Sequence, residues 1–172
     1  FDQDGNLDLF VANGRVTRRD TGPDGEAQWA EPDQLFRGLG GARFEEVAPK
    51  SGLANAPKLV SRGAAFGDVD GDGDVDVVVL DNNSGIRILA NRASTKGHGI
   101  TLRLVGPTGG DALGAMATIT AGDKTWSQRA MTAYSYCSAN DPRVHVGLGA
   151  ATRVDAVHVR WPDGGTESFG PF

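Results

Sequence analysis

A run of nine residues, 68–76, carries a carboxylate at every second position and constrains the fold more than any other part of the chain. Its five aspartates occupy positions 1, 3, 5, 7 and 9 of a loop, and position 6 is Gly73, which permits a sharp reversal of the backbone. Carboxylates this close together repel one another unless a cation neutralises them. The run therefore predicts a tightly wound loop that folds around a bound cation.

The ligand chemistry of this acidic loop favours calcium. Carboxylate oxygens, with no Cys or His in the set, suit Ca²⁺ better than zinc or copper. We expect the main-chain carbonyl of Asp74 and four side chains to be the ligands: Asp68, Asp70, Asp72 and Asp76. An EF-hand is the nearest rival, but its twelfth position, which needs a bidentate Glu, is Val79, and the flanking residues are typical of strands. A metal-free surface turn is the remaining alternative.

The acidic loop has an earlier copy at an offset of 68 residues, because residues 2–9 align with residues 70–77. The earlier copy adds three candidate metal ligands: Asp2, Asp4 and Asp8. Its counterpart of Asp68 would fall before residue 1, so we expect the first site to lack one carboxylate. An aliphatic run follows each copy, at 9–12 and at 77–80, and is typical of a buried strand. The pattern indicates a structural repeat in which an acidic loop leads into a strand.

The composition favours an all-β chain. The sequence contains 25 glycines and 8 prolines in 172 residues, which is typical of short strands joined by many turns. Four runs beyond a small, polar segment alternate apolar and polar residues with a period of two: 100–104, 115–120, 143–146 and 157–161. We therefore expect a repeat region at 1–91, a linker at 92–99 and a separate β domain at 100–172 whose packing does not depend on calcium.

Charge and hydropathy argue against two kinds of partner. The chain has 22 acidic and 17 basic residues, with a formal net charge of −5 and no clustered stripe of Lys and Arg, so we expect no nucleic acid partner. The longest purely aliphatic stretch is residues 77–80. A membrane-spanning helix needs roughly 20 apolar residues, so we expect no membrane span.

Candidate catalytic groups carry a weaker signal than the acidic loop. His145 and His158 each lie between two valines, so strand alternation places both on polar faces. Ser135, Asp141 and His145 are the residue types of a catalytic triad, but no G-x-S-x-G motif surrounds the serine. Cys137 is the only cysteine and is expected to be a small buried thiol. The residues therefore predict no enzyme active site.

The acidic loop and the strand before it resemble the FG-GAP/VCBS repeat of β-propellers, whose blades carry a D-x-D-x-D-G-x-x-D calcium loop between strands. The resemblance rests on residues 62–76. The second half is similar to the ASPIC/UnbV domain, which follows such repeats in the cartilage acidic protein-like family. The stretches that carry this likeness are 112–115, 135–149 and 159–165.

This resemblance implies an all-β fold in which partial β-propeller blades with calcium loops precede a β-sandwich or barrel-like ASPIC/UnbV domain. A propeller needs about four blades to close its ring, so the remaining blades or neighbouring chains are implied to pack against this chain. The resemblance also implies Ca²⁺ as the cofactor, a location that is extracellular, at the cell surface or periplasmic, and no established catalytic residues.

We expect a non-catalytic, calcium-stabilised module that binds a protein or glycan at the cell surface, in adhesion or assembly. One alternative is a structural subunit of a larger cell-surface complex. Another is the non-catalytic part of a surface enzyme whose active site lies upstream.

Overall fold

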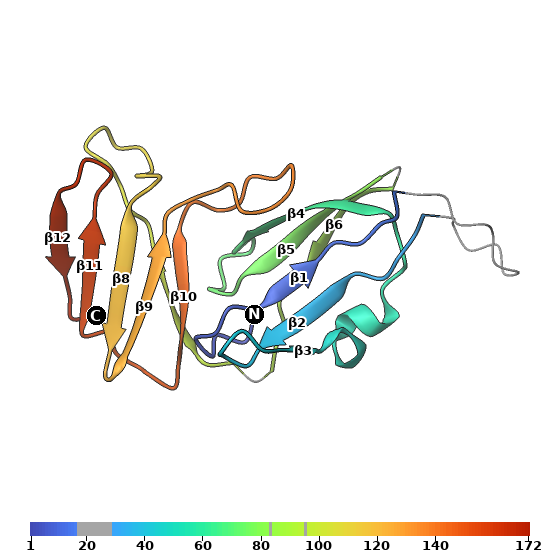
Figure 1. The fold of residues 1–172 in the computed structure, drawn as a ribbon, viewed down its shortest axis with the longest axis horizontal. Coiled ribbons are helices and arrows are strands. Elements are labelled where there is room, and N and C mark those ends of the chain that lie inside the picture. Colours follow the sequence, from blue (N-terminus) through green and yellow to red (C-terminus); the bar gives the residue numbers. More distant parts are fainter. Residues whose placement is uncertain (17–28, 83, 95) are drawn as a thin grey trace, which may run out of the picture.

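The computed structural model describes residues 1–16, 29–82, 84–94 and 96–172 (Figure 1). Every strand pairing in these residues is antiparallel, and the helical elements are two short 3₁₀ turns, Ala48–Lys50 and Gly52–Asn55. Among the described residues there is no helix of the length and hydropathy that crossing a membrane requires. The prediction of an all-β chain is confirmed.

Two three-stranded sheets form the N-terminal half. The first sheet has the order β1-β2-β3, with β1 at Leu9–Val11, β2 at Gln34–Gly38 and β3 at Phe44–Glu46. The second sheet has the order β4-β5-β6, with β4 at Ser61–Gly67, β5 at Asp76–Asp81 and β6 at Gly85–Leu89. Each expected aliphatic strand is present, as β1 and β5, and an acidic loop leads into each. β1 is not the buried strand that was expected, because Leu9 and Val11 are exposed.

The C-terminal half contains a four-stranded sheet and a two-stranded ribbon. The sheet has the order β12-β11-β8-β9, with β8 at Met116–Ala121, β9 at Lys124–Arg129, β11 at Ala156–Arg160 and β12 at Thr166–Phe169. The ribbon pairs β7 (His98–Leu102) with β10 (Val144–Gly149). Alternate residues of β8, β10 and β11 are buried and form one core. In the part of the chain that the structure describes, these strands do not close into a barrel, so the barrel-like alternative is wrong.

The linker expected at 92–99 is shorter in the structure. His98 and Gly99 pair with Gly149 and Gly147 of β10, so they belong to the ribbon. The alternation that begins at Ile100 did not reveal this, because neither residue is apolar enough to extend the pattern. The core of the C-terminal half draws its members from residues 100–161.

A buried ion-pair network joins the two N-terminal sheets. Arg87 of β6 lies between Asp81 of β5, at 2.5 Å, and Asp33, which precedes β2, at 2.8 Å. The Ser61 hydroxyl donates to Asp81 at 2.8 Å and accepts from Arg87 at 2.9 Å. Burial opposes ionisation of Asp81, but the hydrogen bonds from Arg87 and Ser61 outweigh it and hold the pKa of Asp81 below its usual value. The network therefore remains charged while it holds the sheets together.

Candidate metal centre

The loop between β4 and β5 is wound by its own carboxylates. Asp68 accepts hydrogen bonds from the amides of Gly71 and Gly73 at 2.8 and 3.2 Å, and Asp76 accepts one from Val69 at 3.0 Å. Gly71 and Gly73 have φ angles of 79° and 88°, a backbone conformation that glycine adopts at little cost. Acidic and glycine positions together therefore turn the chain back on itself, as their spacing predicted.

Three of the predicted ligands converge. Carboxylate oxygens of Asp68, Asp70 and Asp76 lie within 4.8 Å of one another. Asp76 is 1% exposed, and the amide of Asn91, just after β6, donates to its second oxygen at 2.8 Å. Main-chain donors therefore hold the buried Asp76 carboxylate in a fixed position. The three-aspartate group could bind a cation through its hard oxygen atoms without a rearrangement of β5.

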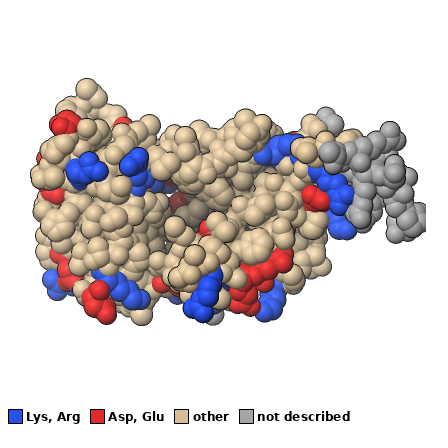
Figure 2. Space-filling view, viewed as in Figure 1, with Lys and Arg blue, Asp and Glu red and all other residues tan. Residues whose placement is uncertain are grey.

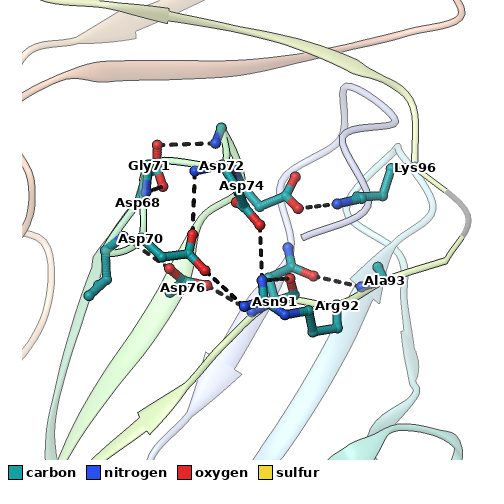
Figure 3. Close-up of polar contacts among 12 residues, drawn as sticks. Asp68, Asp70, Gly71, Asp72, Asp74, Asp76, Asn91, Arg92, Ala93 and Lys96 are labelled. Atoms are coloured by element: carbon teal, nitrogen blue, oxygen red, sulfur yellow. Dashed lines mark hydrogen bonds and ion pairs between the residues drawn. The ribbon is translucent and has the colours of Figure 1, made fainter.

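Arg92 supplies positive charge to this group (Figure 3). Its guanidinium lies 2.8 Å from Asp70 and 2.9 Å from Asp72, and the hydrogen bond holds the pKa of Asp70 below its usual value. The Asp72 side chain points to the guanidinium. Asp72 is therefore not part of the three-aspartate group of Asp68, Asp70 and Asp76. Arg92 thus offsets part of the repulsion that a cation would otherwise have to neutralise.

Asp74 directs its side chain away from the three-aspartate group. Its carboxylate forms an ion pair with Lys96 (Figure 3). It also accepts a hydrogen bond from Gln3 Nε2 at 2.7 Å. The side chain is 4% exposed, so these partners satisfy a buried charge. Because its side chain already has these partners, Asp74 could bind a cation only through its main-chain carbonyl, which is the role expected for it.

The earlier acidic loop is organised differently. Arg37 of β2 lies 2.7 Å from Asp2 and 3.3 Å from Asp4, while the amine of Phe1 lies 2.5 Å from Asp8. Burial opposes ionisation of Asp4, but hydrogen bonds from Asn6 and the charge of Arg37 lower its pKa. In the part of the chain that the structure describes, Asp2, Asp4 and Asp8 are not among the carboxylates that gather as a metal-binding group.

Arg37 and Arg92 were missed by the sequence reasoning. Each pairs with two aspartates that correspond under the repeat offset, Asp2 and Asp4 for Arg37, and Asp70 and Asp72 for Arg92. The signal that could have identified them is the presence of an arginine in or shortly after the strand that follows each aliphatic strand, within β2 for Arg37 and three residues after β6 for Arg92. The number of residues between the paired aspartates and their arginine differs between the two copies, so the pairing does not appear as a sequence motif.

Gln3 connects the acidic loop to the C-terminal half. Its side chain donates to Asp74, and its carbonyl accepts a hydrogen bond from Gly149 at 2.8 Å. Its backbone also packs against Gly147, where an added Cβ would lie 2.6 Å from the Gln3 carbonyl carbon. Nearby, Trp126 Nε1 donates to the carbonyl of Gly5 at 3.0 Å. The first residues of the chain therefore lie between the two halves.

A second contact between the halves runs along β4. The amide of Asp141 donates to the carbonyl of Phe66 at 2.9 Å, and the Asn140 side chain accepts from the Phe66 amide at 2.9 Å. Arg143, paired with Asp141, also reaches the carbonyl of Asp68 at 3.4 Å. The segment before β10 thus extends the edge of the second sheet beside the acidic loop.

His145 and Asp141, two of the residue types of a triad, make other contacts in the structure. His145 Nδ1 bonds the Thr101 hydroxyl at 2.9 Å, and burial lowers the pKa of His145. Asp141 pairs with Arg143, so the order of contacts expected for a triad is not formed. Cys137 is exposed, contrary to the expected buried thiol, because it occupies a surface turn with φ of 48°.

The sequence model of the FG-GAP-like repeat matches residues 1–79, and that of the ASPIC and UnbV domain matches residues 106–171. The chain carries an FG-GAP-like repeat followed by an ASPIC/UnbV domain. A search among curated proteins found no match. Residues 80–105, between the two matched regions, contribute β6 to the repeat sheet and β7 to the ribbon of the ASPIC/UnbV domain.

The two family matches confirm the resemblance. The FG-GAP-like repeat fits a fragment of a β-propeller, and FG-GAP repeat domains are typically extracellular or at the cell surface. Such repeats commonly bind calcium, and the group of Asp68, Asp70 and Asp76 could hold a metal ion. The two domains together are consistent with a surface or extracellular module.

Proposed function

We propose that this chain is a non-catalytic, calcium-stabilised module that serves binding, adhesion or assembly at a cell surface, outside the cell or in the periplasm. The observation that carries the proposal is the convergence of Asp68, Asp70 and Asp76 within 4.8 Å in a loop of the calcium-binding repeat type. Bound calcium would neutralise these charges and hold the turn between β4 and β5.

The donor set fits a hard divalent cation. Asp68, Asp70 and Asp76 would supply carboxylate oxygens, and Asp74 would supply its main-chain carbonyl because its side chain is paired with Lys96. Asp72 would join the set once its carboxylate leaves Arg92. The earlier loop is the weaker candidate, because Arg37 and the terminal amine already pair with its carboxylates.

Exposed apolar residues support the assembly part of the proposal. Leu80, Ile86 and Ile88 of the second sheet are 52%, 68% and 60% exposed, which is unusual for a sheet face. Lys and Arg side chains are scattered and intermixed with Asp and Glu on the face in view (Figure 2). We therefore propose protein partners, either further propeller blades or neighbouring chains, with a surface glycan as the alternative ligand, and no nucleic acid.

Calcium should raise the melting temperature of the chain. When free calcium exceeds its Kd by 100-fold, mass action adds about 2.7 kcal/mol to the free energy of unfolding, which corresponds to several degrees for a chain of this length. Thermal melts in 1 mM calcium, in magnesium and in chelator provide the measurement. If the calcium and chelator melts coincide, the calcium part of the proposal is wrong.

Asp70→Asn should abolish calcium binding, whereas Asp4→Asn should leave it nearly unchanged. Both aspartates are partly exposed and pair with an arginine, so the two variants remove similar charge–charge contacts. Only Asp70 belongs to the three-aspartate group. Titration calorimetry with CaCl₂ measures the number of bound ions, and equal losses in the two variants would show that the earlier loop contributes equally.

A further inference from the structure

Arg92 pairs with two carboxylates that the proposed calcium site needs (Figure 3). Its Nη2 lies 2.8 Å from Asp70, a member of the three-aspartate group, and its Nη1 lies 2.9 Å from Asp72, which the spacing predicts as a ligand. A guanidinium stays charged at physiological pH, and its planar fork binds two acceptors at once. Two cations repel each other, so a carboxylate paired with the guanidinium binds calcium less strongly. Arg92 and calcium therefore compete for the same negative charge.

The main chain around Arg92 is held independently of the Arg92 side chain. The amide of Asn91 donates to the buried Asp76 at 2.8 Å, and Asn91 Oδ1 accepts a hydrogen bond from the Ala93 amide at 3.1 Å. The Arg92 side chain is 64% exposed, so water can solvate the guanidinium when it leaves the aspartates. The side chain can therefore swing away while the main chain continues to hold Asp76 in place.

The earlier acidic loop has the same bridge in a more buried form. Arg37 is 43% exposed and pairs with Asp4 and with Asp2, whose side chain is 9% exposed. Separating Arg37 from Asp2 would leave a buried charge without its partner, which is costly. By contrast, the side chains of Asp70 and Asp72 are 41% and 39% exposed. The arginine bridge is therefore locked in the earlier loop and releasable in the later one.

We propose that Arg92 is a tethered counter-cation that competes with calcium and sets the calcium affinity of the loop. This inference rests on the proposed calcium function and names the regulation of that site. Without calcium, the guanidinium neutralises Asp70 and Asp72 and stabilises the loop. Calcium binding requires these contacts to break, and their loss weakens binding. The loop therefore responds to a higher calcium concentration than its carboxylates alone would require.

Arg92→Gln should lower the Kd for calcium by roughly 3- to 10-fold, because Asp70 and Asp72 then have no competing cation. Arg92→Lys keeps the charge but loses the planar fork, so its Kd should lie between those of Arg92→Gln and the wild type. Arg103→Gln is the matched control and should leave the Kd unchanged. Arg103 is 60% exposed and lies 2.8 Å from Asp111, outside the acidic loop. Titration calorimetry with CaCl₂ on the full 172-residue chain measures all four proteins, in about 0.15 M salt to screen distant charges.

Thermal melts separate competition from simple structural support. In chelator, Arg92→Gln should melt at a lower temperature than the wild type, because the aspartates repel one another without their counter-charge. In saturating calcium the difference should shrink, because tighter binding stabilises the variant more. A residue that only supported the loop would lower the melting temperature equally in both conditions.

Three outcomes would overturn the inference. A Kd for Arg92→Gln that equals or exceeds the wild-type value would show that Arg92 does not compete with calcium, and the calcium proposal would stand because calcium still binds. An equal loss of melting temperature in chelator and in calcium would assign Arg92 a structural role only. If none of the four proteins binds calcium, the inference and the calcium proposal both fail. Circular dichroism confirms that each variant folds, and Arg92→Lys serves as the test if Arg92→Gln does not.

Discussion

Replacing Asp81 by Ala should lower the free energy of unfolding by about 3–5 kcal/mol, the cost of removing one partner from a buried ion pair, and of its two carboxylate partners Arg87 would keep only Asp33. Arg87 would lose the 2.5 Å contact to this carboxylate, and the Ser61 hydroxyl would lose its acceptor. The Asp81 side chain is fully buried, so water cannot replace either contact. Urea denaturation monitored by Trp fluorescence measures the change.

Glu45→Ala is the matched control for this prediction. Glu45 pairs with Lys50 at 3.2 Å, and their side chains are 48% and 76% exposed. A surface ion pair of this kind contributes at most about 1 kcal/mol. Similar losses in the Asp81 and Glu45 variants would mean that the buried network does not hold the two sheets together.

The same network predicts how stability changes in acid. The pKa of Asp81 is lower in the folded chain than in the unfolded chain, where it is near 3.9. Its contribution is therefore present above the unfolded pKa and is lost as pH falls through the folded pKa. The Asp81→Ala variant should lack this part of the acid dependence, which urea titrations from pH 7 to pH 3 would measure.

Replacing Gly147 by Ala should disrupt the contact between the FG-GAP-like repeat and the ASPIC/UnbV domain, at a cost of about 3 kcal/mol. The added Cβ would lie 2.6–2.8 Å from three backbone atoms of Gln3. Backbone atoms cannot rotate away as a flexible side chain can, so Gln3 must move and release its hydrogen bond from Gly149. Hydrogen exchange should therefore accelerate at the Gly149 amide.

The core of the ASPIC/UnbV domain should keep its protection in this variant. Ile119 of β8 and Val157 of β11 are buried within that domain and do not depend on Gln3. Gly110→Ala is the matched control, because its added Cβ would meet no atom within 4 Å. If exchange at Gly149 is equally fast in both variants, the contact at Gln3 is not what joins the domains. The same measurement in chelator tests whether residues 100–172 pack independently of calcium.

The sequence alone determined the local structure and the nature of the acidic loop. Alternating carboxylates with glycine at the turn are short-range features. They predicted that four aspartate side chains converge, and Asp68, Asp70 and Asp76 do, whereas Asp72 turns to Arg92. Period-two alternation likewise predicted β7, β8, β10 and β11 and the position of His145 on the polar side of β10, but it did not predict β9 or β12. These predictions succeed because each depends on residues a few positions apart.

The tertiary structure alone decided how the acidic loops are partnered. Arg92, Lys96 and Gln3 come to the second loop from a later and an earlier segment, and Gln3 lies 71 residues before Asp74. Two further features depend on contacts between distant strands. They are the closure of the strands into a barrel and the choice of which faces of the two N-terminal sheets remain exposed. Sequence patterns carry the periodicity of a strand but not the identity of the side chain that packs across from it, because that pairing is set by the folding of the whole chain.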